Sequence, residues 1–367
     1  MTLASRLPVF TWDRIAPLRE KAGLHPDGPV DLSIGTPVDP VPDLIRSALA
    51  GASNAPGYPA TWGTPGLRSA AAGWLDRALG VSVPADDVLP VIGTKELIAW
   101  LPALLGLGPG DVVVYPELAY PTYDIGVRLA GATGVATDSL LAAGPARVKL
   151  VWVNSPSNPT GRVLPPDHLR KVVSWARERG AVVASDECYI GLGWDVSPMS
   201  VLHPDICVGS ASGVLAVHSL SKRSNLAGYR AGFVTGDSGL VADLLAIRKQ
   251  AGMIVPGPVQ AAMTAALSDD AHAEEQRSRY AARRSSLWAA FSSSGWTIDH
   301  SEAGLYLWVS HPEHDCWSAA ELLAGQAGIL VAPGELYGPA GARHVRVALT
   351  ATDEQVAAAA SRVRALG

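Results

Sequence analysis

The chain has 367 residues, 48% of them hydrophobic and 17% charged, which excludes an intrinsically disordered protein and suggests more than one packed domain. A formal net charge of −5 gives no electrostatic footprint for nucleic acid or for an anionic membrane, so we expect neither partner. The three cysteines form no CxxC pair, the nine histidines show no ligand spacing, and no apolar stretch could serve as a secretory signal or membrane span. We therefore expect a cytoplasmic protein without a disulfide scaffold or a metal site.

The first 257 residues divide into two regions. The stretch to about Asp39 contains one apolar run, Val30–Ile34. Over residues 40–257, short runs rich in valine alternate with segments of helical periodicity, and these runs are apolar on both faces. This alternation predicts an α/β large domain with a mostly parallel, doubly wound sheet. Its predicted strands are Val88–Ile92, Asp111–Tyr115, Val148–Asn154, Ala181–Ser185, Val214–Ser219 and Ala231–Thr235, and its predicted helices are Thr94–Leu105, Pro121–Leu129, Pro166–Arg179 and Gly239–Gln250.

The pattern changes at about Pro258. A long helical stretch, Pro258–Phe291, precedes two apolar runs and two further helical segments. We expect these residues to form a smaller α+β domain, made of residues 1–39 and 258–367. The predicted elements are the strands Leu305–Val309 and Val345–Leu349 and the helices Trp317–Ala327 and Asp353–Leu366.

Polar segments of varied chemistry follow the predicted strands. Ligands of open α/β sheets bind outside the carboxyl ends of the strands, so these segments mark the candidate site. Ordinary loop polarity is the alternative for each segment taken singly. The segments are Gly93-Thr94-Lys95, Pro116 to Tyr120, Asn154 to Gly161, Asp186 to Tyr189 and Ser219 to Lys222.

Four motifs in order carry a resemblance that covers almost the whole chain. They are NSPSNPTG at 154–161, SDECY at 185–189, SLSKRSNLAGYRAG at 219–232 and HVRVA at 344–348. Together they resemble the class I/II aminotransferases among the fold-type I pyridoxal-phosphate enzymes. The resemblance implies that fold, pyridoxal 5′-phosphate as cofactor, ping-pong transfer between an amino acid and a 2-oxo acid, and a homodimer with shared active sites.

The resemblance also assigns the catalytic roles. Lys222 would form the Schiff base with the cofactor aldehyde, which requires a primary amine, and would then move the proton at the substrate Cα. Asp186 would keep the pyridine nitrogen protonated, so that the ring accepts electrons. Tyr189 and Asn158 would donate hydrogen bonds to the phenolic oxygen. A solvated loop lysine, a strand-end aspartate and a turn asparagine are the structural alternatives.

Further residues would hold the cofactor and the substrate. A phosphate needs backbone amides at a helix start together with positive charge. Lys95 departs from the family, which has a small or neutral residue there, and could instead face the substrate or be an exposed helix lysine. By resemblance the phosphate site comprises Gly93, Thr94, Lys95, Ser219, Ser221 and Arg230, with Tyr120 stacking on the ring and Tyr58 reaching the other subunit's phosphate. The substrate site comprises Gly35, Asn158 and Arg346, with Arg346 binding the α-carboxylate.

A finer resemblance concerns the substrate. Segments such as LPVFTWD, PVIGTKELIAWLP and ILVAPGELYGPAGARHVRVALTATDE are similar to actinobacterial N-succinyldiaminopimelate aminotransferases. This implies transfer between N-succinyl-LL-2,6-diaminopimelate and 2-oxoglutarate, in lysine and diaminopimelate biosynthesis. Such a substrate carries distal carboxylates that need extra cations, for which Lys95, Arg223 and Arg68 are the candidates. The alternatives are an aromatic or acetylornithine-type aminotransferase, a β-lyase, and a non-catalytic binding or regulatory homologue.

Overall fold

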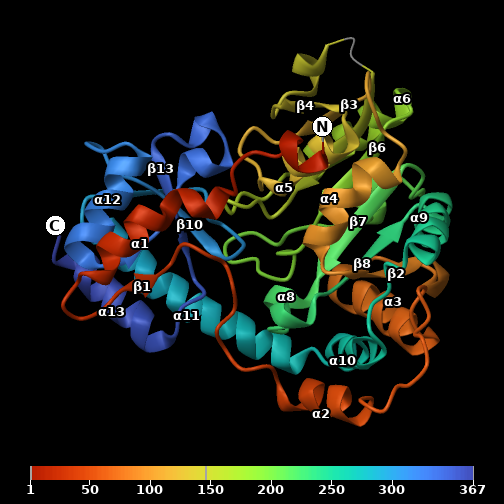
Figure 1. The fold of residues 1–367 in the computed structure, drawn as a ribbon, viewed down its shortest axis with the longest axis horizontal. Coiled ribbons are helices and arrows are strands. Elements are labelled where there is room, and N and C mark those ends of the chain that lie inside the picture. The colour runs from red at the N-terminus through yellow and green to blue at the C-terminus, as the bar shows by residue number, and fades with distance from the viewer. Residues whose placement is uncertain (1, 145–146, 367) are drawn as a thin grey trace.

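The computed structural model describes residues 2–144 and 147–366, which fold into two groups of elements lying side by side (Figure 1). The larger group contains a seven-stranded sheet. Its strands are β2 (Val88–Ile92), β3 (Val112–Tyr115), β4 (Thr133–Ala136), β5 (Val148–Asn154), β6 (Val182–Asp186), β7 (Val214–Ser219) and β8 (Ala231–Gly236). Their order across the sheet is β2-β8-β7-β6-β5-β3-β4.

The predicted α/β sheet is confirmed, and it is mostly parallel. Neighbouring strands from β7 to β4 pair in parallel, whereas β8 runs antiparallel to both β7 and β2. All six residues of β7 are buried, because helices cover both faces of the sheet. The helices of this group are α2 (Asp43–Gly51), α3 (Pro65–Leu79), α4 (Thr94–Leu104), α5 (Thr122–Ala130), α6 (Pro166–Glu178), α7 (Pro204–Cys207), α8 (Leu220–Arg223), α9 (Ser238–Ala251) and α10 (Gly257–Ser268).

Each face of the sheet has its own hydrophobic core. Side chains of α3, α6 and α10 pack on one face, and side chains of α4, α5 and α9 pack on the other. The polar segments that follow the parallel strands therefore emerge at one edge of a rigid, doubly covered sheet.

The smaller group combines the amino-terminal segment with the end of the chain. Residues of β1 (Val30–Asp31) pair in parallel with β11 (Ile329–Leu330), and Val30 and Leu32 pack in the core of this group. A four-stranded antiparallel sheet has the order β12-β13-β10-β9, with β9 (Thr297–Asp299), β10 (Tyr306–Ser310), β12 (Ala332–Pro333) and β13 (His344–Ala348). The helices here are α1 (Ala16–Gly23), α11 (Ala271–Ser293), α12 (Cys316–Ala327) and α13 (Asp353–Arg364).

Short 3-10 segments complete the chain. They are η1 (Leu3–Arg6), η2 (Thr11–Ile15), η3 (Ala85–Asp87), η4 (Leu140–Ala143), η5 (Ala227–Tyr229), η6 (Gly334–Tyr337) and η7 (Pro339–Gly341). The first of them lies against α5, where Arg128 donates a 3.4 Å hydrogen bond to the carbonyl of Arg6. The amino-terminal segment thus starts on the larger group and crosses to the smaller one (Figure 1).

The predicted helical stretch Pro258–Phe291 is helical, but it forms two helices, α10 and α11, instead of one. Asp269 has an extended backbone, which ends α10, and its carboxylate accepts a 2.9 Å hydrogen bond from the His272 amide at the start of α11. The two helices bury different faces: α10 packs against the seven-stranded sheet, and α11 packs in the smaller group. We keep the division into residues 40–257 and residues 1–39 with 258–367 as a proposal.

A buried ion-pair cluster holds the amino-terminal segment where it passes between the two groups. The guanidinium of Arg283 on α11 donates bonds of 2.6 and 2.8 Å to the two carboxylate oxygens of Asp39 and one of 2.7 Å to Asp353. Gln276 donates a 2.7 Å bond to Asp39 and accepts a 2.9 Å bond from Asn225, which lies just beyond α8. Burial acts to raise the pKa of Asp39, but the bonds from Arg283 and Gln276 outweigh it and the pKa is lowered.

Replacing Asp39 by asparagine should lower the free energy of unfolding by about 3 kcal/mol at pH 7, because it leaves Arg283 buried beside a neutral partner. The folded-state pKa of Asp39 lies below its ordinary value, so its contribution is present at neutral pH and is lost as the pH falls below about 4. Urea unfolding at pH 7 and at about pH 2.5, well below the ordinary aspartate pKa, measures the difference. Asp167→Asn, which breaks an exposed pair with Arg170, is the control and should cost less than about 1 kcal/mol. A cost for Asp39→Asn no larger than the control's would contradict the prediction.

Candidate active site

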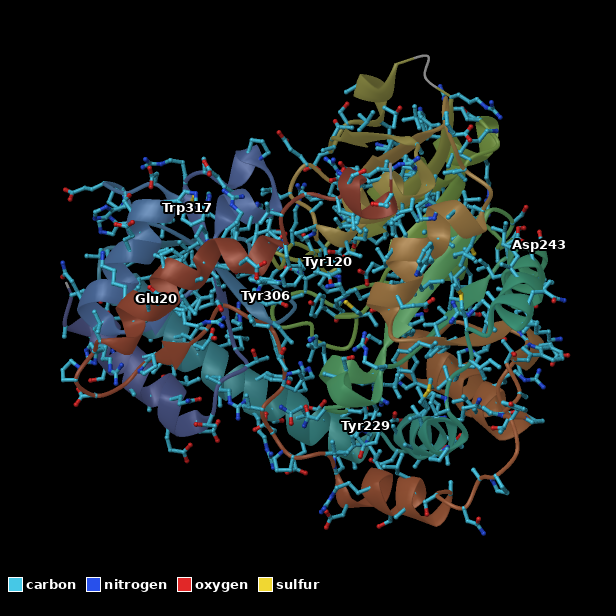
Figure 2. All side chains as sticks on the ribbon, in the orientation of Figure 1. Glu20, Tyr120, Tyr229, Asp243, Tyr306 and Trp317 are labelled. Atoms are coloured by element: carbon cyan, nitrogen blue, oxygen red, sulfur yellow. The ribbon has the colours of Figure 1, made fainter. Side chains whose placement is uncertain are left out.

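One cavity of about 200 Å³ gathers nearly all the residues singled out in the sequence. It lies at the carboxyl ends of the parallel strands, and Tyr120 and Tyr306 face it from the two groups of elements (Figure 2). Of the predicted site, Gly35, Thr94, Lys95, Tyr120, Asn158, Asp186, Tyr189, Ser219, Ser221, Lys222, Arg230 and Arg346 line this cavity.

Lys222 reaches the cavity from the short helix α8, directly after β7. The Ser219 hydroxyl accepts a 3.1 Å bond from the Ser221 amide and so caps this turn. The lysine amine donates a hydrogen bond to the carbonyl of Gly35. Burial lowers the pKa of Lys222 to about 8, and the positive charges of Arg346 and Arg230 act in the same direction. At neutral pH the neutral, nucleophilic fraction of the Lys222 amine is therefore larger than that of an exposed lysine.

This amine should react with an added aldehyde faster as the pH rises. Since its pKa is about 8, the neutral fraction increases about tenfold per pH unit below that value and levels off above it. Stopped-flow absorbance after mixing the cofactor-free protein with pyridoxal 5′-phosphate at pH 6 to 9.5 measures the dependence. A rate still rising steeply between pH 9 and 9.5 would show an amine with an ordinary lysine pKa.

Asp186 ends β6 and is only 3% exposed. Its carboxylate accepts a 2.9 Å bond from the Tyr123 hydroxyl and a 3.2 Å bond from the Cys188 amide. Among residues 2–144 and 147–366, no cationic side chain forms an ion pair with it. Burial raises the pKa of Asp186, although the bonds from Cys188 and Tyr123 oppose that rise. A buried carboxylate of this kind provides a place for a positively charged ligand atom.

A hydrogen-bond chain connects Asp186 to the arginine of β13. Asn154, at the end of β5, donates a 2.9 Å bond to the Asp186 carbonyl and accepts a 2.7 Å bond from the Asn158 amide. The Asn158 side chain accepts a 2.8 Å bond from Arg346, whose other terminal nitrogen donates a 2.5 Å bond to the carbonyl of Ser33. These bonds use two of the five guanidinium N–H groups, so Arg346 can still bind a carboxylate.

Four other residues form a cradle for an anion. The helix α4 begins at Thr94 and points its amino terminus into the cavity, with the hydroxyls of Ser219 and Ser221 and the guanidinium of Arg230 around it. Gly93 does not line the cavity, but the backbone at this position, next to the cavity, requires a glycine. Its φ is +73°, and a Cβ there would meet the Arg230 guanidinium.

Tyr58 and Lys95 differ from the other predicted site residues in their surroundings. Tyr58 lies outside the cavity with its side chain fully exposed, so a single chain does not bring it to the site. Lys95 lines the cavity and forms no hydrogen bond or ion pair with the residues that the structure describes. Its amine lies 5.5 Å from the centre of the Phe10 ring, and burial together with Arg230 lowers its pKa. Lys95 is thus an exposed lysine at the start of α4 whose side chain also lines the cavity.

The sequence interpretation assigned no site role to several residues that matter here. Tyr123 and Asn154 hold Asp186 and Asn158, and their one signal was proximity to the polar strand ends. Residues from remote segments had no such signal, because only the packing of the smaller group brings them near Lys222. These lining residues are Trp12, Ile34, Thr36 and Tyr306, and Cys188 of the Asp186–Tyr189 segment lines the cavity as well.

A second cavity, of about 190 Å³, lies on the other side of the loop that follows β5. Its floor is apolar, with Val114, Val151, Val153 and Val172, and Arg162 and His168 contribute charge or polarity. Residues of two candidate segments, among them Pro116, Asn154 and Thr160, line it, but none of the residues assigned a catalytic, cofactor or substrate role does. The chemistry is therefore concentrated in the first cavity.

Comparison with known families identifies the chain. The model of the family "Aminotransferase class I and II" matches residues 27–363, which is nearly the whole length. The chain belongs to this family. The aminotransferase is therefore a pyridoxal-phosphate-dependent enzyme, as the four motifs implied.

Several curated proteins resemble the aminotransferase along most of its length. A "probable aminotransferase" of Mycobacterium tuberculosis is 63% identical over 98% of this chain and 86% of its own. A 4-dedimethylamino-4-oxo-anhydrotetracycline transaminase of Streptomyces rimosus is 59% identical over 97% of this chain and 99% of its own. An LL-diaminopimelate aminotransferase of Desulforudis audaxviator is 33% identical over 98% and 95%.

Solved structures show the same fold. An aminotransferase of Neisseria meningitidis superposes with a TM-score of 0.91 at 31% identity, covering 100% of this chain and 99% of the other. A "probable N-succinyldiaminopimelate aminotransferase" of Thermus thermophilus superposes with a TM-score of 0.86 at 28% identity, covering 97% and 100%. The predicted fold-type I architecture is thereby confirmed.

The cavity of the aminotransferase fits the cofactor. Its polar groups are complementary in kind to those of pyridoxal 5′-phosphate: a partly neutral amine for the aldehyde, an unpaired buried carboxylate for the ring nitrogen, and an anion cradle for the phosphate. Within residues 2–144 and 147–366 there is no cluster of side chains suited to a metal ion and no helix long and apolar enough to cross a membrane.

Proposed function

We propose that amino transfer takes place in this cavity and that Lys222 is its covalent and proton-moving residue. The observation that supports this most is the position of the Lys222 amine, which lines one cavity together with Asp186 and Arg346. When bound, pyridoxal phosphate supplies an aldehyde that binds amines covalently and a ring that accepts the electrons of the substrate Cα–H bond. Lys222 would hold the cofactor through that aldehyde, and its amine would carry the proton from and to Cα when it is free.

The other residues hold the reacting groups in place. Asp186 stabilises the positive charge of the pyridine nitrogen, and Tyr189 and Asn158 donate hydrogen bonds to the phenolic oxygen. Tyr120 stacks on the ring. The phosphate is bound by Gly93, Thr94, Ser219, Ser221 and Arg230, and the substrate α-carboxylate by Arg346 with Gly35.

We further propose N-succinyl-LL-2,6-diaminopimelate and 2-oxoglutarate as the substrate pair, which would place the enzyme in lysine and diaminopimelate biosynthesis in the cytoplasm. The similarity to the Thermus structure and to the LL-diaminopimelate aminotransferase supports this proposal. The Streptomyces relative, at 59% identity, supports a second candidate: transfer to the ketone of a tetracyclic compound.

Only one of the three cations suggested for distal carboxylates lines the cavity. Arg68 pairs with Asp86 and lies 3.9 Å from the centre of the Trp62 ring, and Arg223 donates a 2.8 Å bond to the Ala266 carbonyl. Both are therefore used elsewhere in the fold. We assign the distal carboxylate to Lys95, which has a free charge in the cavity wall.

The test of the reaction is spectroscopic. L-Glutamate should decrease the visible absorbance of the lysine-bound cofactor, and 2-oxoglutarate should restore it. A panel of acceptors should then include the keto forms of N-succinyl-diaminopimelate, N-acetylornithine, aromatic amino acids and a tetracyclic ketone. A spectrum that no amino donor changes would contradict transamination and favour a binding or regulatory role, whereas product formed without a keto acid would indicate a β-lyase.

Replacing Lys95 by methionine should raise KM about tenfold or more for a donor with a distal carboxylate and less than threefold for L-alanine, because it removes one charge-assisted hydrogen bond. Steady-state kinetics with both donors measures the difference. Lys249→Met, on the exposed side of α9, is the control. An equal loss with both donors, or a weaker affinity for the cofactor alone, would place Lys95 at the phosphate instead.

We also propose a homodimer in which Tyr58 completes the partner's phosphate site. Its full exposure in the single chain, together with the partial exposure of the apolar side chains of Val38 and Leu44, supports a surface that a second copy covers. Sedimentation of the purified protein at micromolar concentration tests the assembly.

A further inference from the structure

Tyr306 is the first residue of β10 and lines the cavity opposite the sheet that carries Lys222. Its hydroxyl lies 3.0 Å from the hydroxyl of Tyr189, and the two rings meet edge to face with centres 5.7 Å apart. Both side chains are buried. Figure 2 shows Tyr306 between the two groups of elements, near Tyr120.

The ring of Tyr306 has a second contact. The central carbon of the Arg346 guanidinium lies 3.9 Å from the ring centre, closer than it lies to the rings of Tyr337 and Trp12, at 4.8 and 5.5 Å. At this distance the ring face attracts the cation and restricts its orientation. One side chain therefore contacts both the phenol next to the cofactor site and the arginine proposed to bind the substrate carboxylate.

The position of Tyr306 also accounts for Gly35. A Cβ at residue 35 would collide with the Tyr306 hydroxyl, and the Gly35 carbonyl accepts the bond from Lys222. The glycine thus lets the tyrosine hydroxyl approach Tyr189 at the place where the amino-terminal segment crosses the cavity.

Proton counting sets the direction of the Tyr189–Tyr306 bond. Each phenol has one proton to donate. If Tyr189 donates its proton to the phenolic oxygen of the cofactor, as in the proposed function on which this step rests, its own oxygen accepts from Tyr306. A phenol that accepts a hydrogen bond becomes a stronger donor.

We propose that Tyr306 is a positioning residue of the aminotransferase: its hydroxyl strengthens the hydrogen bond that Tyr189 gives to the cofactor, and its ring orients Arg346 for the substrate carboxylate. The two effects belong to different atoms of the side chain, so two substitutions separate them. Tyr306→Phe removes the hydroxyl and keeps the ring, whereas Tyr306→Leu removes both.

The hydroxyl is tested by the pH titration of the holoenzyme's visible absorbance, a measurement independent of turnover. A hydrogen bond to the phenolic oxygen favours the deprotonated form of the lysine-bound cofactor, in which that oxygen carries more negative charge, so it lowers the midpoint. Tyr306→Phe should therefore raise the midpoint by about 0.3 pH unit, and Tyr189→Phe should raise it further. Tyr115→Phe, which removes a phenol hydroxyl that bonds to Asp124 outside the cavity, should leave it unchanged.

The role of the ring is tested by steady-state kinetics, which measures whether each substitution changes KM for the amino donor. Tyr306→Phe should leave KM for the amino donor within twofold of the wild type, whereas Tyr306→Leu should raise it about five- to thirtyfold, the value of one cation–π contact. The proposal is overturned if the wild type transaminates while Tyr306→Phe keeps the wild-type midpoint or lowers it, or if Tyr306→Leu keeps the wild-type KM. If the wild-type spectrum responds to no amino donor, the proposed function itself is wrong. Recovery of folded protein by circular dichroism is checked for each variant, and Tyr306→Phe remains informative should Tyr306→Leu not fold.

Discussion

Lys222→Ala should lower kcat/KM for amino transfer by at least about 10⁴-fold, the largest loss that we expect from any single substitution. The change removes both the covalent attachment and the group that moves the Cα proton, and general acid–base catalysis by one residue alone is worth about 10² to 10⁴. The protein should still fold, because Lys222 makes one side-chain hydrogen bond, to the Gly35 carbonyl, and no ion pair with the residues described. Coupled assay of glutamate formation, with circular dichroism for the fold, measures both expectations.

Two controls make this experiment specific. Borohydride reduction followed by peptide mass spectrometry should place the cofactor on residue 222 in the wild type and on no residue in the variant. Lys249→Ala, on the exposed surface of α9, should keep wild-type activity. Turnover retained by Lys222→Ala would rule out the proposed mechanism.

Arg346→Lys should lower kcat/KM about 30- to 5,000-fold, the second-largest effect. The guanidinium sits in a site with fixed partners, the Asn158 side chain and the Ser33 carbonyl, and it has N–H groups left for a carboxylate. An ammonium keeps the charge but cannot bond to both partners and to a carboxylate in the same plane. Losing one partner of a buried, hydrogen-bonded charge pair costs about 2–5 kcal/mol, which corresponds to that range.

The kinetic division tells how the arginine acts. A rise in KM with kcat unchanged would mean that Arg346 binds the ground state and the transition state equally. A fall in kcat as large as the fall in kcat/KM would mean that the arginine aligns the Cα–H bond in the transition state. Arg343→Lys, three residues earlier and exposed, is the matched control. Kinetics of Arg346→Lys within threefold of the wild type would remove the arginine from substrate binding.

Local signals were enough to predict most of the larger group of elements. The boundaries of β2, β5 and β7 agree with the predicted runs, because these strands are buried on both faces and their apolar residues are continuous. The edge strand β4, with the sequence TGVA, has a mostly exposed side and no comparable run, and it was not predicted. The alanine-rich α3 was missed because its helical period is weak. The helix α2 has a clear period but only nine residues, and it was missed among the surrounding glycine and proline.

The amino acids alone determined the family, the cofactor and the part of the site that follows the strands, because each of those residues lies within a short motif attached to a strand end. Only the tertiary structure decided that Lys95 faces the cavity, that Arg68 and Arg223 pair elsewhere, and that Trp12, Ile34 and Tyr306 form the opposite wall. These residues come from segments far apart in the chain and have no local signature. Their positions result from how the smaller group packs against the larger one. That packing depends on side chains throughout the hydrophobic cores of both groups.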